Sequence, residues 1–220
     1  MSRVNTILFD FDGTLADTNN LIASSHLHVL DRYFPGQYTK EMVRKYNGPS
    51  LEQTYTELMP EHVTEAVTMY REFNHRVHDE LITSFPDVEA SLKELKASGL
   101  KLVVVSTKYE YVLKRGLEVL GLSDYFDLII AGDQIQQVKP DPEQLQLAMT
   151  TLKVEPQQCL MIGDNWQDIA AGENAGVETV FVEWSEKTVS ELAPHKPNKT
   201  VSSMLELTEW IKTKSYGGER

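Results

Sequence analysis

The stretch Asp10-Phe11-Asp12-Gly13-Thr14-Leu15 directly follows a short apolar run, Thr6–Phe9, and so places two carboxylates at the end of a predicted strand. Such side chains diverge unless the backbone turns, and Gly13 permits that turn. Asp and Gly are also common turn formers, so this stretch alone leaves a simple turn and a functional site about equally plausible. The residues that follow the other predicted strands decide between them.

Apolar runs of the same kind alternate with helical patterns through most of the chain. They are Thr6–Phe9, Leu102–Val105, Asp127–Ala131, Cys159–Ile162 and Thr179–Val182, with a weaker run near Thr200-Val201. Nearly continuous runs of Val, Ile and Leu are typical of parallel strands buried on both faces. Helices are predicted between them, for example from Pro86 to Gly99, with a proline start and a glycine stop. The alternation predicts an α/β fold with a Rossmann-like doubly wound parallel sheet.

Residues 18–81 interrupt this alternation. They contain no strand-like run but four helical stretches: Asn20–Phe34, Lys40–Tyr46, Leu51–Leu58 and Glu61–Leu81. We therefore expect a catalytic core formed by residues 1–17 and 82–220, with a helical cap domain at 18–81 inserted after the first strand.

Composition narrows the range of partners. The chain has 220 residues, a single cysteine and a formal net charge of −12. One cysteine allows no internal disulfide, and no stretch approaches a membrane span or a signal peptide, so we expect a cytoplasmic protein with no membrane partner. We also expect a monomer. The acidic balance argues against nucleic acid as a partner. An acidic protein that acts on an anion must neutralise charge locally, through a metal ion or well-placed cations.

Polar and charged residues also follow the other predicted strands. They are Ser106-Thr107-Lys108 after the second run, Lys139 next to Pro140 after the third, and Asp164 and Asp168 after the fourth. Ligands bind beyond the carboxyl ends of strands in open α/β sheets, so we expect all of these groups at one crevice. Each one alone is a weak indication, but together and in this order they favour a functional site.

The residue types then indicate the reaction. Carboxylates that meet at one crevice repel each other unless a divalent cation lies among them, and oxygen ligands suit Mg²⁺. Ser106, Lys139 and the backbone N–H groups around Thr107 would bind a phosphoryl group. One carboxylate would attack phosphorus, and a second would protonate the leaving oxygen and later activate water.

These motifs resemble the four motifs of the haloacid dehalogenase superfamily, in the same order and over the whole chain, cap insert included. The resemblance implies that Asp10 is the nucleophile and Asp12 the acid/base. It also implies that the Asp10 carboxylate, the Asp12 backbone carbonyl and the Asp164 carboxylate bind Mg²⁺. Asp168 would then support the metal site or Lys139. Dehalogenase members lack an acid at the position of Asp12, so its presence favours phosphoryl transfer.

The predicted cap resembles that of a bacterial inorganic pyrophosphatase group within this superfamily, whose sister group is the phosphoglycolate phosphatases. The cap segments that carry this resemblance are Thr18–Ile22, Tyr46–Leu51, Tyr70–His75 and His78–Leu81. The expected function is hydrolysis of a small phosphate-bearing anion, with pyrophosphate as the first choice and phosphoglycolate as the second. A phosphomutase and a non-catalytic phosphate-binding regulator are the remaining alternatives.

Three further residues are candidates for binding the far end of the substrate: Lys108 at the rim of the core, and Lys45 and Gly48 near a cap loop. His75 and His78 are one helical turn apart and could be read as a metal pair. Because no third ligand lies nearby in the sequence, we expect both on a solvated helix face.

Overall fold

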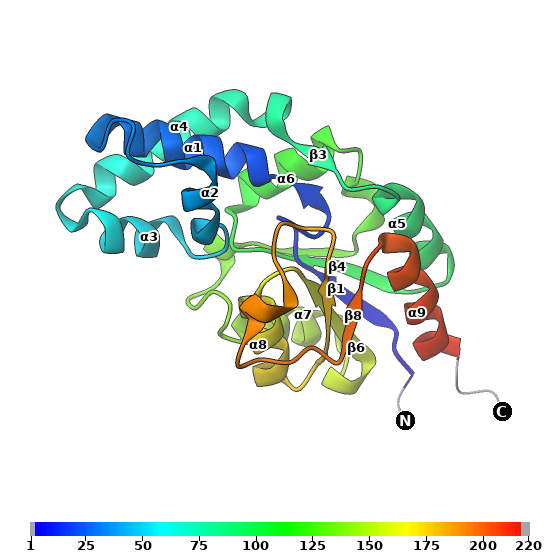
Figure 1. The fold of residues 1–220 in the computed structure, drawn as a ribbon. Coiled ribbons are helices and arrows are strands. Elements are labelled where there is room, and N and C mark those ends of the chain that lie inside the picture. Colours follow the sequence, from blue (N-terminus) through cyan, green and yellow to red (C-terminus); the bar gives the residue numbers. More distant parts are fainter. Residues whose placement is uncertain (1–2, 217–220) are drawn as a thin grey trace. The chain divides into compact units, whose positions relative to one another are not determined.

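The computed structural model describes residues 3–216, and the chain packs as two compact units (Figure 1). One unit comprises Met1–Asp17 and Ser84–Arg220, and the other comprises Thr18–Thr83. The predicted α/β fold is confirmed, with the helical unit inserted after the first strand. The sequence places the boundary between the helical cap and the rest of the core at 81/82, whereas the helical unit of the structure ends at Thr83. The role of this unit as a substrate cap stays a prediction.

The larger unit is built on a six-stranded parallel sheet with the order β5-β4-β1-β6-β7-β8. The strands are β1 (Thr6–Phe9), β4 (Lys101–Val105), β5 (Leu128–Ile130), β6 (Cys159–Gly163), β7 (Glu178–Val182) and β8 (Lys199–Val201). Every residue of β1 and β6 is buried, as expected for central strands covered on both faces. Each apolar run of the sequence therefore forms a strand.

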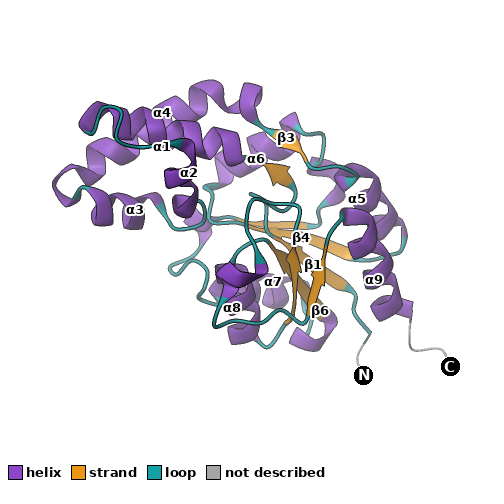
Figure 2. Ribbon diagram, viewed as in Figure 1, coloured by secondary structure: helices purple, strands orange, loops and turns teal. Residues whose placement is uncertain are grey.

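Helices cover both faces of this sheet (Figures 1 and 2). On one face α5 (Val88–Ala97) packs against α9 (Met204–Tyr216), whereas α7 (Glu143–Leu152) and α8 (Trp166–Ala175) pack together on the other. A buried apolar cluster contains residues of the central strands and of α7, including Leu8, Val103, Met161 and Leu145. The remaining elements of this part of the chain are β2 (Ala16–Asp17), α6 (Glu110–Val119), η3 (Ser123–Tyr125), η4 (Gly132–Gln134), η5 (Pro156–Gln158) and η6 (Val189–Leu192).

The second unit is helical, as the sequence predicts. It contains α1 (Asn19–Tyr33), α2 (Lys40–Val43), η1 (Arg44–Tyr46), α3 (Leu51–Leu58), η2 (Pro60–His62) and α4 (Val63–Leu81), and β3 (Thr83–Ser84) follows. α3 begins with a capping box, in which Ser50 Oγ accepts from the Gln53 N–H and Gln53 Oε1 accepts from the Ser50 N–H. This reciprocal pair satisfies N–H groups that have no partner within the helix.

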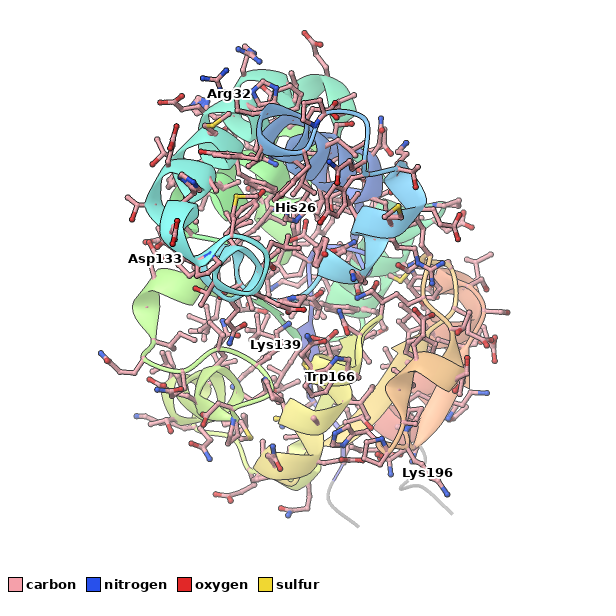
Figure 3. The ribbon with its side chains drawn as sticks, turned by 60° about the vertical axis from the view of Figure 1, so that its left-hand side comes forward. His26, Arg32, Asp133, Lys139, Trp166 and Lys196 are labelled. Carbon is pink, nitrogen blue, oxygen red and sulfur yellow. The ribbon has the colours of Figure 1, made fainter. Side chains whose placement is uncertain are left out.

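Polar side chains lie inside the helical unit as well as on its surface. His26, labelled in Figure 3, is buried. Its Nδ1 lies 3.0 Å from Tyr55 Oη, and its ring packs against the rings of Tyr46, Tyr55 and Tyr70. The expectation that His78 lies on a solvated face is wrong, because the side chain is fully buried and Nδ1 lies 2.8 Å from Asp79 Oδ1. Among the described residues, no helix has the length and apolar character needed to cross a membrane.

Candidate active site

The register of the sheet places the motif residues side by side. Phe9, the last residue of β1, lies opposite Val104 of β4 and Ile162 of β6. The chain after β1 runs first to β4 on one side and later to β6 on the other, so the strand order reverses beside β1. Asp10 therefore emerges at a topological switch point, where α/β proteins bind their ligands.

The loop after β1 turns at Gly13, which has a φ of +77°. This left-handed conformation favours glycine because it has no side chain. The Gly13 N–H donates to the Ala16 carbonyl at 2.8 Å and closes the turn. The backbone of Gly13 also lies directly against the buried carboxylate of Asp164, so the turn brings the loops after β1 and β6 into contact.

Lys139 lies between two carboxylates. Its Nζ donates to Asp10 Oδ1 at 2.7 Å and to Asp168 Oδ1 at 2.6 Å, and all three side chains are buried. A third hydrogen bond, to the Val105 carbonyl at 3.2 Å, completes the set of acceptors around the ammonium. Lys139 thus connects the loop after β5 to the ends of β1 and β4 and to the start of α8.

Asp168 also caps the helix on which it lies. Its Oδ2 accepts from the backbone N–H of Asn165 at 3.1 Å, in a capping box at the start of α8. Both oxygens of Asp168 therefore have donors, one from Lys139 and one from the backbone. This geometry suits the predicted role of Asp168 as a support for Lys139.

Negative charge exceeds positive charge in this buried cluster. Burial raises the pKa of Asp10 well above its usual value; the Lys139 ammonium opposes this shift, and the neighbouring carboxylates add to it. Burial likewise raises the pKa of Asp164 to about 6, against an opposing contribution from Lys187. Burial alone would lower the pKa of Lys139, but the carboxylates of Asp10 and Asp168 outweigh it and raise it. The Lys139 ammonium is thus shared by Asp10 and Asp168, and Lys187 adds a second positive charge near Asp164.

A divalent cation would relieve this excess of negative charge. Asp10, Asp164 and Asp168 each offer a carboxylate oxygen, and these oxygens lie within 4.8 Å of one another. A compact set of hard oxygen donors fits Mg²⁺. The Asp12 carboxylate is not in this set, and its Oδ1 accepts from Lys108 Nζ at 2.8 Å. This is compatible with the prediction that Asp12 offers its backbone carbonyl to the metal.

The second motif lies at the end of β4. Ser106 is buried, its N–H donates to the Ile130 carbonyl at 3.0 Å, and its Oγ accepts from the Lys108 N–H at 3.2 Å. The Thr107 backbone lies against Gly132, where a side chain on the glycine would overlap the Thr107 carbonyl. Contacts with Ile130 and Gly132 therefore hold the loop after β4 in place.

The comparison with known proteins agrees with this geometry. The family model for haloacid dehalogenase-like hydrolases matches residues 7–182, which is most of the chain. The chain belongs to the haloacid dehalogenase-like hydrolases. The relative named pyrophosphatase PpaX from Bacillus cereus is 43% identical over 205 residues, covering 93% of this chain and 95% of the relative.

Solved structures of other proteins have the same fold. A protein from Bacteroides fragilis assigned to these hydrolases superposes with a TM-score of 0.88 at 30% identity, covering 93% of this chain and all of that one. A predicted phosphatase from Clostridium acetobutylicum superposes with a TM-score of 0.87 at 27% identity, covering 96% and 99% of the two chains.

Sequence reasoning missed the residues that follow β7. Trp184 Nε1 donates to the Thr14 carbonyl at 3.0 Å, and Ser185 Oγ donates to Asp164 Oδ2 at 2.6 Å. Lys187 is half-buried, and burial lowers its pKa while nearby carboxylates, Asp164 foremost, raise it. The only sequence indication was their place after a strand, since the segment contains no motif.

The predicted substrate-binding residues are divided between the two units. Lys108 belongs to the hydrolase core, where it pairs with Asp12. Lys45 and Gly48 belong to the helical unit, and Lys45 Nζ lies 5.0 Å from the centre of the Tyr46 ring. Their contact with substrate stays a prediction.

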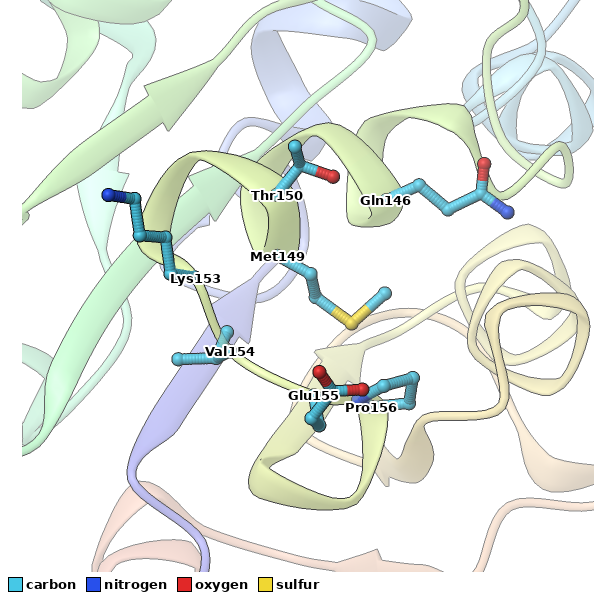
Figure 4. Close-up of a pocket in the computed structure, with 7 residues that line it drawn as sticks. All are labelled: Gln146, Met149, Thr150, Lys153, Val154, Glu155 and Pro156. Atoms are coloured by element: carbon cyan, nitrogen blue, oxygen red, sulfur yellow. The ribbon is translucent and has the colours of Figure 1, made fainter.

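A separate depression of about 390 Å³ lies away from the motif residues (Figure 4). It is lined by Gln146, Met149, Thr150, Lys153, Val154, Glu155 and Pro156. These residues come from the end of α7 and the segment before β6, at the amino ends of the strands. None of the predicted site residues lines it, so we do not place the active site there.

We expect Gly13→Ala to damage the active site, because a methyl group there would overlap Asp164 Oδ2 and would also occupy a left-handed conformation. Gly99→Ala is the matched control: Gly99 has a similar φ of +79°, but nothing lies within 4 Å of its added Cβ. Phosphatase assays and thermal unfolding of both variants test this. Gly99→Ala should cost about 1 kcal/mol and keep full activity, whereas Gly13→Ala should lose at least about a hundredfold in activity. Equal losses of activity in the two variants would contradict the inferred importance of the close contact between Gly13 and Asp164.

Proposed function

We propose that this chain is a Mg²⁺-dependent phosphohydrolase that acts through a phospho-aspartyl intermediate on Asp10. The observation that supports it best is the Lys139 geometry. One ammonium binds Asp10 Oδ1 at 2.7 Å and leaves Oδ2 as the oxygen for attack on phosphorus. Attack by this oxygen would expel the leaving phosphate or alkoxide and form an acyl phosphate, which water then hydrolyses.

The other residues have roles set by their contacts. Asp10, Asp164 and the Asp12 carbonyl would hold Mg²⁺, which when bound neutralises charge on the phosphoryl oxygens. Ser106, Lys139 and the backbone of Thr107 would bind the same phosphoryl group. Asp168 would keep Lys139 in place through its 2.6 Å hydrogen bond.

Asp12 would be the general acid and later the general base. A halide leaves without a proton, whereas a phosphate or alkoxide leaving group needs one, so an acid at this position favours phosphoryl transfer. Lys108 Nζ donates to Asp12 Oδ1 at 2.8 Å, and this hydrogen bond holds the carboxylate in one orientation.

We further propose that the substrate is inorganic pyrophosphate. The relative at 43% identity, matched over 95% of its length, is named a pyrophosphatase and supports this choice. Pyrophosphate and phosphoglycolate present the same phosphoryl group to Asp10, Ser106 and Lys139 and differ at the far end. There pyrophosphate carries a second phosphate, which Lys108 or Lys45 would bind.

Steady-state phosphate release from the two substrates with Mg²⁺ tests this proposal. A charge-assisted contact with the distal phosphate is worth roughly 1.5–3 kcal/mol, so kcat/KM for pyrophosphate should exceed that for phosphoglycolate by at least about tenfold. Excess chelator should abolish turnover, and Ca²⁺, with its longer bonds and higher coordination number, should support it poorly. A preference for phosphoglycolate would contradict the pyrophosphatase assignment, and full activity in chelator would contradict the metal assignment.

A further inference from the structure

The segment after β7 is attached to the active-site loops at two points. Trp184 Nε1 donates to the Thr14 carbonyl at 3.0 Å, in the loop that carries Asp12. Ser185 Oγ donates to Asp164 Oδ2 at 2.6 Å, in the loop after β6. We call residues 184–185 the β7 clip. The clip follows β7, which lies beside β6 in the sheet, and β6 in turn lies beside β1.

Ser185 acts on one particular oxygen of Asp164. Asp164 is 3% exposed, and its Oδ2 lies against Gly13 on one side and accepts a hydrogen bond from the Ser185 hydroxyl. The hydrogen bond takes up Oδ2 and so favours Oδ1 as the oxygen for a metal ion. A hydrogen bond to a charged group that water cannot reach is stronger and shorter than one between neutral groups.

The other two carboxylates of the cluster are held in a different way. Asp10 and Asp168 both accept from Lys139, which fixes them relative to each other. Asp164 has the same sign of charge and lies within 4.8 Å of them, so repulsion would turn it away unless another donor held it. Among the described hydrogen bonds of its side chain, that donor is Ser185. The nearby Lys187 ammonium attracts the Asp164 carboxylate as well, whereas the Ser185 hydroxyl acts on one defined oxygen.

We propose that Ser185 is a positioning residue for the divalent-cation site, and that the β7 clip holds Asp164 Oδ1 ready for the metal before the metal binds. This inference rests on the proposed role of Asp164 as a metal ligand. Residues that hold metal ligands in place commonly contribute 10- to 100-fold to metal affinity.

Mn²⁺ binding to the whole protein, followed by electron paramagnetic resonance without substrate, tests the proposal. Ser185→Ala should raise the Kd for Mn²⁺ at least about fivefold, and Ser185→Thr, which keeps the hydroxyl, should stay within about twofold of the original protein. Trp184→Phe keeps an aromatic ring but loses the N–H donor, and should weaken binding in the same direction by a smaller factor.

The matched control is Ser202→Ala. Ser202 Oγ also donates to a carboxylate, that of Glu206 at 3.0 Å, but at an exposed position away from the motif residues. This variant should leave the Kd unchanged. In activity assays, Ser185→Ala should raise the Mg²⁺ concentration needed for half-maximal rate, while kcat at saturating Mg²⁺ should fall much less.

The outcomes separate this proposal from the proposed function. An unchanged Kd in Ser185→Ala, or an equal loss in Ser185→Thr, would overturn the positioning role even if the enzyme hydrolyses pyrophosphate. Failure to hydrolyse pyrophosphate, with the expected order of Kd values, would overturn only the substrate assignment. Absence of Mn²⁺ binding to the unaltered protein would overturn the positioning role together with the metal site.

Discussion

Asp10→Asn is expected to lower the rate of phosphate release by at least about a thousandfold. The amide has nearly the shape of the carboxylate but is not a nucleophile, so the acyl phosphate cannot form. The fold should survive, because Lys139 keeps its 2.6 Å hydrogen bond to Asp168 and one buried acid is removed from a crowded cluster. Steady-state kinetics and thermal unfolding of the same preparation measure the two effects.

Asp124→Asn is the control for this substitution. Asp124 is an exposed aspartate in η3, outside the motif loops, so its variant should keep the original rate. If Asp10→Asn retained more than about a thousandth of the activity while Asp124→Asn behaved as expected, attack by Asp10 would be contradicted. A direct attack by water would then fit better.

Lys139→Met is expected to lower both activity and stability. The substitution leaves the buried carboxylates of Asp10 and Asp168 without their shared cation, and breaking a buried ion pair in this way typically costs about 3–5 kcal/mol. Activity should fall at least about a hundredfold, because the phosphoryl oxygens lose a charged donor. Urea unfolding and phosphate-release assays measure these changes.

Mg²⁺ should restore part of the stability lost in Lys139→Met, since a second cation would again neutralise the carboxylates, but it should not restore activity. Lys114→Met is the matched control. Lys114 forms an exposed pair with Glu110 on α6, and such pairs contribute at most about 1 kcal/mol. Similar losses of stability in the two variants would contradict the charge balance inferred for the cluster.

The positions of the strands along the chain and the identity of the motif loops were predictable, because both depend on local residue type. Continuous apolar runs such as Cys159–Ile162 indicate buried parallel strands, and parallel strands bring their carboxyl ends to one edge. Lys139, Asp10 and Asp168 lie in loops at that edge, where Lys139 contacts both carboxylates. The register itself, with Phe9 opposite Val104 and Ile162, required the structure.

Features that depend on tertiary packing were not predictable in the same way. His78 has the spacing of a surface histidine but is fully buried. The helical stretches named from the sequence do not include α9 (Met204–Tyr216), which packs against α5. Ser185 reaches Asp164 only because β7 lies beside β6, and a serine in a loop gives no sequence indication of that contact.

Trapping the phospho-enzyme is the most direct test of Asp10 as the nucleophile. Excess protein would be mixed with radiolabelled pyrophosphate and Mg²⁺, quenched in acid at successive times within a single turnover, and digested for mass spectrometry. We predict a transient covalent phosphate on the peptide that contains Asp10, with the label on the Asp10 side chain, and no label in Asp10→Asn. Complete turnover without covalent label at any quench time, or label on another residue, would contradict the assignment of Asp10 as the nucleophile.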